Sequence, residues 1–331
     1  MLELIKEYII KFTDFVCGWP LFTLLIGGGI FLFIYSRALP LRKLGMAVSS
    51  LKMKKKGEGQ VSSFQALMNT ISSTVGMGNI AGVAIALCVG GPGAIFWMWV
   101  SALLGMATKF FEGTLAIMYK GKDDKGVIQG GPMFVLTEGL GRKMKPLAVM
   151  FAFCALFSGL PVMQANQLSE SLYSVILEPL GVPESRWVFL MLGLVIGGIV
   201  SLVIFGGIKR ISQVSSRIVP FMVGFYFLMV LGIMIVYHDR LPAVFDAIFK
   251  GAFCWKAGFG ALAAVALTGA RRAMFVNEAG VGTAGMMHGA SMNAEPVREG
   301  LVAMLGPAID SGLVCTLSAI PMIMAGLYST D

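Results

Sequence analysis

The sequence predicts an all-α membrane protein, on the basis of its composition, its apolar segments and the placement of its charges. Hydrophobic residues make up 56% of the chain and charged residues only 13%, whereas soluble domains carry about 25% charged residues. The 42 glycines also suit membrane helices, which tolerate glycine better than soluble helices do. So little charge cannot cover a water-exposed surface, and we therefore expect the chain to lie in a lipid bilayer.

Eight apolar segments are long enough to cross a bilayer as helices, because about 17 residues suffice. They lie at 20–37, 63–88, 92–119, 147–177, 187–205, 218–237, 252–268 and 300–326. Charged linkers separate them. The expected architecture is a bundle of about eight transmembrane helices.

Lysine and arginine gather in alternate linkers, at 37–56, 120–145, 209–217 and 271–298. Basic loops stay on the cytoplasmic side of a membrane. We therefore expect a multi-pass protein of the cell membrane with both chain ends outside. Topology and lipid headgroups then explain the net charge of +8, and no nucleic-acid partner is expected.

Three of the predicted spans contain residues that interrupt a helix. The second holds small and polar residues at 72–79, the fourth holds Ser-Gly-Leu-Pro at 158–161, and the seventh holds GFGAL at 258–262. Each glycine weakens a helix by about 1 kcal/mol relative to alanine. Unwound backbone at this depth is tolerated only where protein buries it or where it lines a cavity. These interruptions therefore indicate the candidate binding region.

Two of the interruptions are related in sequence. GMGNIAGV at 76–83 and GFGALAAV at 258–265 share a G-x-G core and a final valine. They lie five predicted spans apart, so the two copies cross the membrane in opposite directions, as in inverted five-helix repeats. Residues 63–237 would form the first repeat, after an extra helix and a basic linker at 1–62. Residues 252–331 supply only two helices of the second repeat, which we expect to be incomplete.

A broken helix suits a zwitterionic amino acid carried together with Na⁺. Free N–H groups of one half-helix attract a carboxylate, and free carbonyls of the other half can replace the water around a cation. The candidate substrate-binding residues are Thr74, Gly76, Met77, Gly78, Gln164, Phe259 and Gly260. Asn79 offers an amide oxygen, either as a sodium ligand or as a brace for the unwound loop.

Each of these assignments has a structural alternative. The glycines would also allow close packing of helices. Gln164 would be costly in lipid without a partner, and Pro161 one turn earlier loosens its helix. The glutamine is therefore expected either to face the substrate or to form a hydrogen bond between helices. Asn166 and Gln167 are interpreted as structural.

Lys109 and Glu112 lie three residues apart on the third span. A proton relay or ion path is conceivable for such a pair. We favour an ordinary pair on one helix, with the lysine reaching toward the membrane surface.

Glu278 lies in a predicted cytoplasmic turn, where it would either pair with Arg271 or Arg272 as a latch or remain solvated. His238 and His288 fall in predicted loops and make no metal site, and the five isolated cysteines are interpreted as small hydrophobic residues.

Other classes of membrane protein find little support in the sequence. The phosphate-binding pattern G-x-x-x-x-G-K-[ST] is absent, which argues against an ATP-driven pump. No nucleophile–base set is visible, so an enzyme is not expected. Neither a pore helix nor a ring of charges suggests a channel.

The segments GGPGAIFWMW at 90–99 and GMATKF at 105–110 resemble the signature of the alanine/glycine:cation symporter family. Segments 76–83, 257–262 and 275–280 match it too, so the resemblance covers almost the whole chain. It implies a leucine-transporter-type fold, coupling to sodium or sometimes protons, and alanine, glycine or occasionally glutamine as substrate. The family also has an extra helix before its five-plus-five core, which fits the first span.

Carried over residue by residue, the resemblance puts the substrate at Gly76, Met77, Gly78 and Gln164. Met77 departs from the family pattern, in which threonine often stands between the glycines. The resemblance also implies sodium ligands at the carbonyls near Ser72 and Val75, together with hydroxyls of an eighth core helix that this sequence lacks.

The expected function is therefore sodium-coupled symport of a small neutral amino acid, alanine or glycine, with no cofactor other than Na⁺ as the coupling ion. The alternative is a truncated, non-transporting membrane fragment that needs a partner fragment for the missing helices.

Overall fold

The computed structural model describes residues 2–16, 18–51, 57–123, 126–253 and 259–326. The regular elements of this part of the chain are helices, apart from β1 (Gly121–Lys122) and β2 (Ile128–Gln129), which form a short antiparallel pair. The prediction of an all-α protein is confirmed.

Four helical stretches of the described chain are long and apolar enough to cross a bilayer. They are α7 (Gly93–Met118), α11 (Arg186–Ile204), α12 (Gly207–Val236) and the stretch Pro296–Met324. The last stretch consists of α16 (Pro296–Ala303), α17 (Leu305–Pro307), the π-helical turn η6 (Ala308–Val314) and α18 (Cys315–Met324). The bent pair α5 (Ser63–Thr74) and α6 (Met77–Gly90) would make a fifth span.

The remaining expected spans differ from helices of full length. Segment 20–37 corresponds to α2 (Trp19–Tyr35), which is apolar but shorter and follows α1 (Leu2–Val16). Segment 147–177 is divided into α9 (Lys145–Ser158), α10 (Val162–Leu172) and the π-helical turn η3 (Tyr173–Leu177). The break at 159–161 falls where Gly159 and Pro161 predict it, because proline cannot continue the hydrogen-bond ladder.

The boundaries expected for the seventh span were wrong. Helix α13 (Leu241–Ala252) ends where that span should begin, and α14 (Phe259–Asn277) continues past 268. Arg271 and Arg272 argued against an apolar continuation, but both lie half-buried within α14 and line a cavity of about 260 Å³ beside α6. Long basic side chains can cover apolar surface with their stems, so they do not end the helix.

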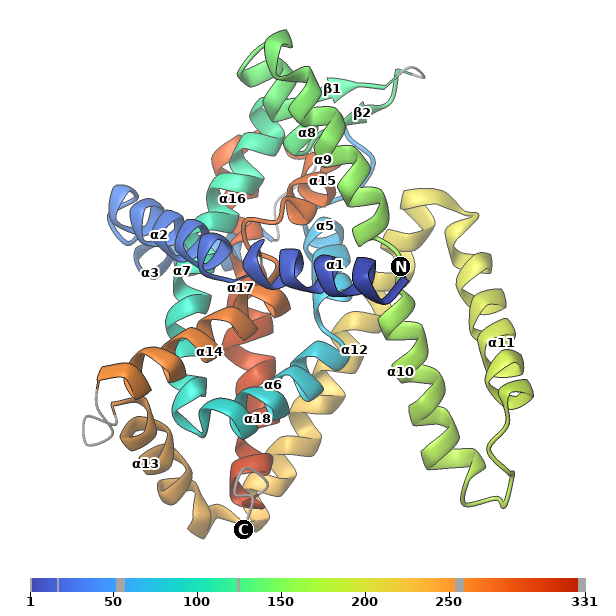
Figure 1. Ribbon diagram of the computed structural model, residues 1–331. Coiled ribbons are helices and arrows are strands. Elements are labelled where there is room, and N and C mark those ends of the chain that lie inside the picture. Colours follow the sequence, from blue (N-terminus) through green and yellow to red (C-terminus); the bar gives the residue numbers. More distant parts are fainter. Residues whose placement is uncertain (1, 17, 52–56, 124–125, 254–258, 327–331) are drawn as a thin grey trace.

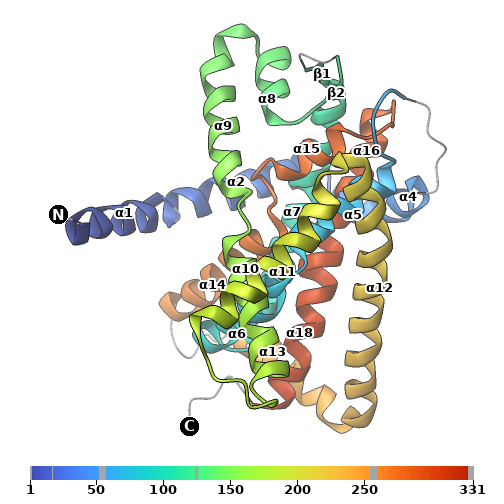
Figure 2. The same ribbon diagram turned by 90° about the vertical axis from the view of Figure 1, so that its right-hand side faces the viewer.

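Shorter elements connect these helices. They are α3 (Leu39–Arg42), α4 (Leu44–Ser50), α8 (Pro132–Phe134), η1 (Val135–Gly139), η2 (Arg142–Met144), η4 (His238–Arg240) and α15 (Thr283–Gly289). Figure 1 shows α10 and α11 forming a hairpin along one side of the bundle, and Figure 2 shows α1 extending away from it.

Helix α7 packs along α14 and α16, and its small residues allow the close approach. A Cβ at Gly93 would lie 2.2 Å from the carbonyl carbon of Gly251 in α13, and one at Gly113 would lie 2.7 Å from Cβ of Ala303. Membrane helices commonly use small residues in this way, because dispersion contacts replace the hydrophobic effect between helices in lipid.

The buried apolar residues form two main cores. One contains Val83 of α6 and Cys315 of α18, and the other contains Ile71 of α5 and Leu305 of α17. The chain passes from one core to the other at the α5–α6 break and at η6. Polar side chains gather at this level, and the candidate site is therefore built there.

Candidate functional site

The first break lies at residues 75 and 76, where α5 and α6 meet at an angle of 48°. The amide oxygen of Asn79 accepts a hydrogen bond from the backbone N–H of Gly76 at 2.9 Å. This bond satisfies a backbone N–H group at the start of α6 that has no acceptor within the helix. Asn79 therefore braces the break, which is one of the two roles that the sequence allowed.

The second break lies at residues 278–282, between α14 and α15. Here the amide oxygen of Asn277 accepts a hydrogen bond from the N–H of Ala279 at 3.0 Å. Glu278, Gly280 and Gly282 all have positive φ angles, a region that favours glycine. Each break is thus capped by a buried asparagine amide.

The break in the second half of the chain lies some way from the segment 258–262 that the sequence indicated. Gly258 falls outside the described residues, and so does the side chain of Phe259. Gly260 is exposed near the start of α14, and nothing lies within 4 Å of a Cβ added there. The structure therefore does not bring Gly260 to the first break.

The four half-helices pack in pairs. Helix α6 contacts α14, and α5 contacts α15. A Cβ added at Gly78 would lie 4.0 Å from Val276 at the end of α14, and one added at Gly82 would lie 3.8 Å from it. The two breaks thus face each other between the cores.

A cavity of about 510 Å³ lies beside both breaks, and it also reaches the break between α9 and α10. Its polar lining includes Ser72 and Ser73 of α5, Gln164 of α10, and Glu278 and Thr283 from the second break. Glu278 is the only charged residue that the described part of the chain contributes to this lining. The volume falls within the range of about 300–1,000 Å³ that is usual for ligand sites.

Several hydroxyl groups that line the cavity already donate hydrogen bonds within the protein. Ser72 and Ser73 donate to the carbonyls of Asn69 and Thr70, at 2.7 and 2.8 Å. Thr283 donates to a carboxylate oxygen of Glu278 at 2.6 Å. Arg271 and Arg272, the expected latch partners of Glu278, line the separate cavity beside α6.

The other candidate residues lie elsewhere. Val75, Gly76 and Asn79 line a smaller apolar cavity of about 130 Å³ against Met222 and Tyr226 of α12. Thr74 lies next to the break, and the side chain of Met77 falls outside the described residues. Of the candidates whose side chains the structure describes, only Ser72 and Gln164 share the large cavity.

A second group of polar side chains lies between the cores. The sequence singled out two of its members, Asn79 and Lys109, but did not connect them with each other or with Asp310 and Ser311. Asn79 donates through Nδ2 to Oδ1 of Asp310, which belongs to η6. Asn277 donates through Nδ2 to the hydroxyl of Ser311 at 3.2 Å. Lys109 of α7 is completely buried and acts electrostatically on Asp310. We call Asn79, Lys109, Asn277, Asp310 and Ser311 the polar layer.

The expected snorkelling of Lys109 is wrong. Its side chain has no exposed surface, because α14, α16 and η6 pack over this part of α7. Glu112 does not bind it either, since Oε1 of Glu112 accepts from the N–H of Gly285 at 3.0 Å.

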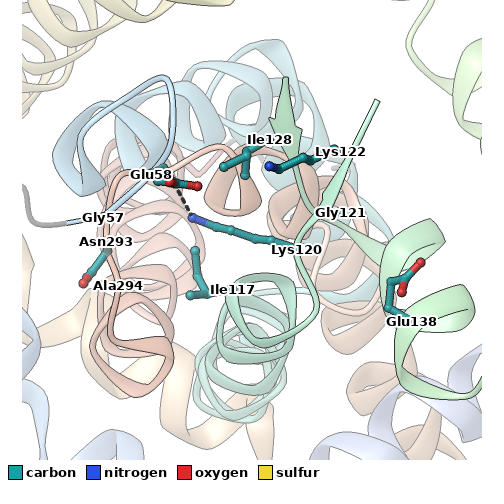
Figure 3. Close-up of a pocket in the computed structure, with 10 residues that line it drawn as sticks. All are labelled: Gly57, Glu58, Ile117, Lys120, Gly121, Lys122, Ile128, Glu138, Asn293 and Ala294. Atoms are coloured by element: carbon teal, nitrogen blue, oxygen red, sulfur yellow. Dashed lines mark hydrogen bonds between the residues drawn. The ribbon is translucent and has the colours of Figure 1, made fainter. Parts of the chain in front are cut away.

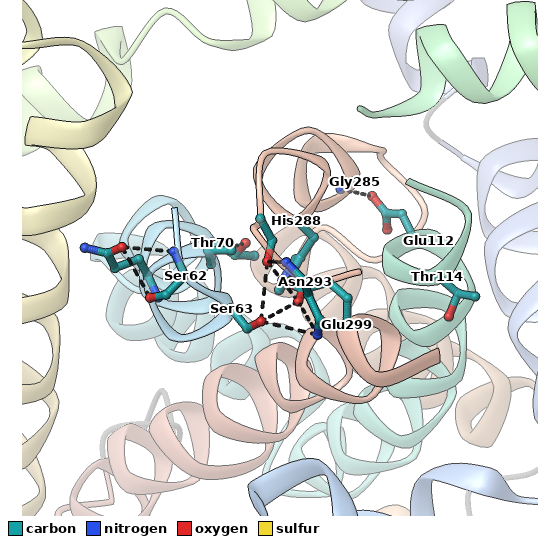
Figure 4. A network of polar contacts seen from close by, with 12 residues as sticks. Ser62, Ser63, Thr70, Glu112, Thr114, Gly285, His288, Asn293 and Glu299 are labelled. Atoms are coloured by element: carbon teal, nitrogen blue, oxygen red, sulfur yellow. Dashed lines mark hydrogen bonds and ion pairs between the residues drawn. The ribbon is translucent and has the colours of Figure 1, made fainter. Parts of the chain in front are cut away.

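A third polar network joins α5, α15 and α16 (Figure 4). His288 belongs to α15 rather than to a loop, and its Nδ1 lies 2.6 Å from Oε1 of Glu299. Oε2 of Glu299 accepts from Ser63 at 2.6 Å, from Ser291 at 3.0 Å and from Asn293 at 3.2 Å. This network anchors the half-helix α5.

A further cavity of about 560 Å³ lies beside β1, and Lys120 is among its lining residues (Figure 3). The ammonium of Lys120 donates to the backbone carbonyls of Glu58 and Ser291, at 3.1 and 2.6 Å. Burial lowers the pKa of Lys120 below its ordinary value. Because its described hydrogen bonds go to backbone, Lys120 ties two chain segments together.

The match to known families decides the class of protein. The model of the sodium:alanine symporter family matches residues 2–331. The chain belongs to this family. The resemblance seen in the sequence is therefore confirmed, and with it a multi-pass membrane protein of a transporter family.

Individual relatives within the sodium:alanine symporter family support the same class. The chain is 40% identical to the sodium/alanine symporter AgcS of Methanococcus maripaludis. The match includes 95% of this chain and 70% of that protein. It is 39% identical, over 98% of its length, to the putative sodium/proton-dependent alanine carrier protein YrbD of Bacillus subtilis, of which it covers 66%. It is 33% identical, over 99% of its length, to the probable sodium/glutamine symporter GlnT of the same organism, of which it covers 68%. These comparisons do not support the partner fragment that the alternative interpretation required.

Proposed function

We propose that this protein carries a small neutral amino acid, alanine or glycine, across the cell membrane together with Na⁺. The observation that carries the proposal is the cavity beside two facing helix breaks, in a member of the sodium:alanine symporter family. One similar protein is described as a sodium/alanine symporter and another as a putative sodium/proton-dependent alanine carrier. No chemical transformation is part of this function.

The proposed substrate site is the lining that Ser72, Gln164 and Glu278 share. A zwitterionic amino acid carries an ammonium and a carboxylate. The carboxylate of Glu278 complements the ammonium, and the amide N–H groups of Gln164 can donate to the substrate carboxylate. Met286 and Met287 line the same cavity and offer an adaptable apolar surface to the substrate side chain.

The proposed sodium site lies at the end of α5. A break leaves the last carbonyls of a helix without their usual N–H partners, and such carbonyls, here near Ser72 and Val75, can replace the water around Na⁺. Asn79 holds the break open, because its amide oxygen is already bonded to Gly76.

We further propose that residues 63–237 and 252–331 belong to two inverted repeats, with both chain ends outside and eight membrane spans. The pairing of α5 with α15 and of α6 with α14 supports this arrangement, since paired broken helices build the midplane site of such transporters. The corresponding elements are then the breaks at 75–76 and 278–282.

Uptake by proteoliposomes tests the function. Vesicles that contain the purified chain should accumulate labelled alanine when an inward Na⁺ gradient is imposed. Replacing Na⁺ with K⁺ should abolish the accumulation, and unlabelled glycine should compete. Protein-free vesicles provide the control. Absence of sodium-dependent accumulation by correctly folded protein would contradict the proposal, and competition by glutamine alone would move the substrate assignment to the larger amino acid.

A further inference from the structure

Two fully buried side chains of opposite charge each leave a polar atom unpartnered in the polar layer. Lys109 has no exposed surface and Asp310 is 1% exposed. Among the described residues, neither Nζ of Lys109 nor Oδ2 of Asp310 has a hydrogen-bond partner. An unpartnered charged group in the interior of a membrane protein is costly. The arrangement therefore calls for a further group between or beside them.

Asp310 lies at the first break. Its Oδ1 accepts from Nδ2 of Asn79, and Thr74, whose hydroxyl donates to the carbonyl of Ile71 at 3.4 Å, lies close to the carboxylate. Thr74 is the last residue of α5, so the carboxylate lies next to the helix end whose final carbonyls lack N–H partners. A free carboxylate oxygen, a hydroxyl and unpaired carbonyls are the oxygen ligands that a hard cation requires.

The charges around Asp310 favour one more cation. Lys109 acts on it as an opposite charge, and Glu278 acts on it as a like charge. The Asp310 carboxylate thus has one cation among its charged neighbours and a second carboxylate, that of Glu278, which lines the large cavity. A bound Na⁺ would balance the second negative charge, whereas a further anion would increase the imbalance.

Lys109 does not satisfy Asp310 directly. The described ion pairs do not include these two residues, and the free atoms of both remain unpaired. The ammonium is nevertheless fixed inside the bundle, between the turn of Gly105, which faces Asn277, and the turn of Gly113, which faces Ala303. It therefore acts on any ion at Asp310 through space, as a repulsive charge.

We propose that Asp310 is a ligand of the coupling Na⁺ and that Lys109 is a fixed counter-charge that limits how tightly this ion is held. The inference rests on the proposed sodium coupling and adds the residues that bind and release the ion. A transported ion must bind well enough to be taken up and weakly enough to leave. A carboxylate provides the first property, and the nearby ammonium provides the second.

The test is the Na⁺ dependence of thermal unfolding of the purified chain in detergent, titrated against choline at constant ionic strength. The wild type should gain stability with Na⁺. Asp310→Asn keeps the size of the side chain but loses its charge, and its half-maximal Na⁺ concentration should rise by at least about tenfold. Lys109→Met should shift that concentration the other way, by roughly tenfold, because a repulsive charge is removed.

The result for Lys109→Met cannot be explained by misfolding, since a misfolded protein does not bind Na⁺ more tightly. Glu112→Gln is the matched control, because glutamine can still accept from Gly285 and the residue lies outside the polar layer. Its Na⁺ titration should match the wild type. Equal Na⁺ stabilisation of the wild type and Asp310→Asn would overturn the inference and leave the symport function standing. A wild type that is stabilised by alanine but indifferent to Na⁺ would instead overturn sodium coupling itself.

Discussion

Nδ1 of His288 lies 2.6 Å from Oε1 of Glu299, and neither side chain has any exposed surface. The pair joins α15 to α16, and Ser63 extends it to α5 through a hydrogen bond of 2.6 Å to Glu299. Three helices therefore share one carboxylate, and α5 joins two neighbouring helices across 236 residues of sequence. Because α5 and α15 are the half-helices at the proposed site, this carboxylate sets their relative position.

Removal of this carboxylate should destabilise the protein strongly. Glu299→Ala leaves His288 and the Ser63 hydroxyl without their partner, and breaking a buried pair costs about 3–5 kcal/mol. His288→Ala should have a similar effect. Because the two residues share one interaction, the double variant should lose less than the sum of the single losses. Thermal unfolding in detergent measures all three variants, and strictly additive losses would show that the pair is not coupled.

The close contact between α7 and α13 should tolerate no added methyl group. Gly93→Ala would place Cβ 2.2 Å from the backbone of Gly251, so the helices must separate, at a cost of about 1–3 kcal/mol. Gly193→Ala on α11 is the matched control, since nothing lies within 4 Å of its added Cβ. Yield and thermal unfolding of the two variants should differ. Equal stability would mean that α7 and α13 do not pack as described.

The sequence predicted well those features that depend on local chemistry. The breaks at 75–76 and 159–161 lie at glycine and proline, which weaken a helix interior, although Pro220 lies inside the continuous helix α12. The long apolar helices α7, α11 and α12 follow from composition. Asn79 was recognised as a ligand or a brace, and the choice between these roles depended on its distance to Gly76.

The polar layer depends on contacts that span much of the chain. Asn79 and Asp310 are 231 residues apart in sequence, so spacing along the chain does not connect them. Asp310 did carry a signal, because an ionisable residue inside an apolar span is a candidate functional residue by default. Lys109 was misinterpreted because the spacing to Glu112 says nothing about the helices that cover α7.

Gln164 should contribute to substrate binding rather than to folding. Gln164→Ala removes an amide that lines the large cavity, and a polar contact in a membrane interior is worth on the order of 1 kcal/mol. A several-fold rise in the alanine concentration for half-maximal uptake is expected, with unchanged thermal unfolding. Asn166→Ala is the control, because Asn166 lies on the same helix outside that lining. If both variants weakened uptake equally, the cavity would not be the substrate site.

Membrane orientation is testable with reporter fusions. The basic linkers predict that a reporter placed after Glu58 reads cytoplasmic and that one placed after Arg186 reads external. Swapped signals at these two positions would reverse the proposed topology. They would not affect the pairing of the half-helices, which is independent of orientation.

The position of the second helix break can be tested with two glycines. The sequence predicts the break at one of them, and the structure has it at the other. The sequence pointed to Gly260, whereas the structure puts the break at 278–282. Gly282 has a φ of +97°, and an added Cβ would lie 2.6 Å from a ring carbon of Pro132 and 3.0 Å from the ring of Phe151. Gly282→Ala should therefore strain the backbone by about 1–3 kcal/mol and displace Glu278 and Thr283 from the cavity, so that alanine uptake falls more than protein yield. Gly260→Ala adds a methyl group in open space within a helix, where alanine is favoured over glycine, and uptake should remain near the wild-type rate. Loss of uptake from Gly260→Ala, with Gly282→Ala unaffected, would place the functional break at the N-terminal end of α14 after all.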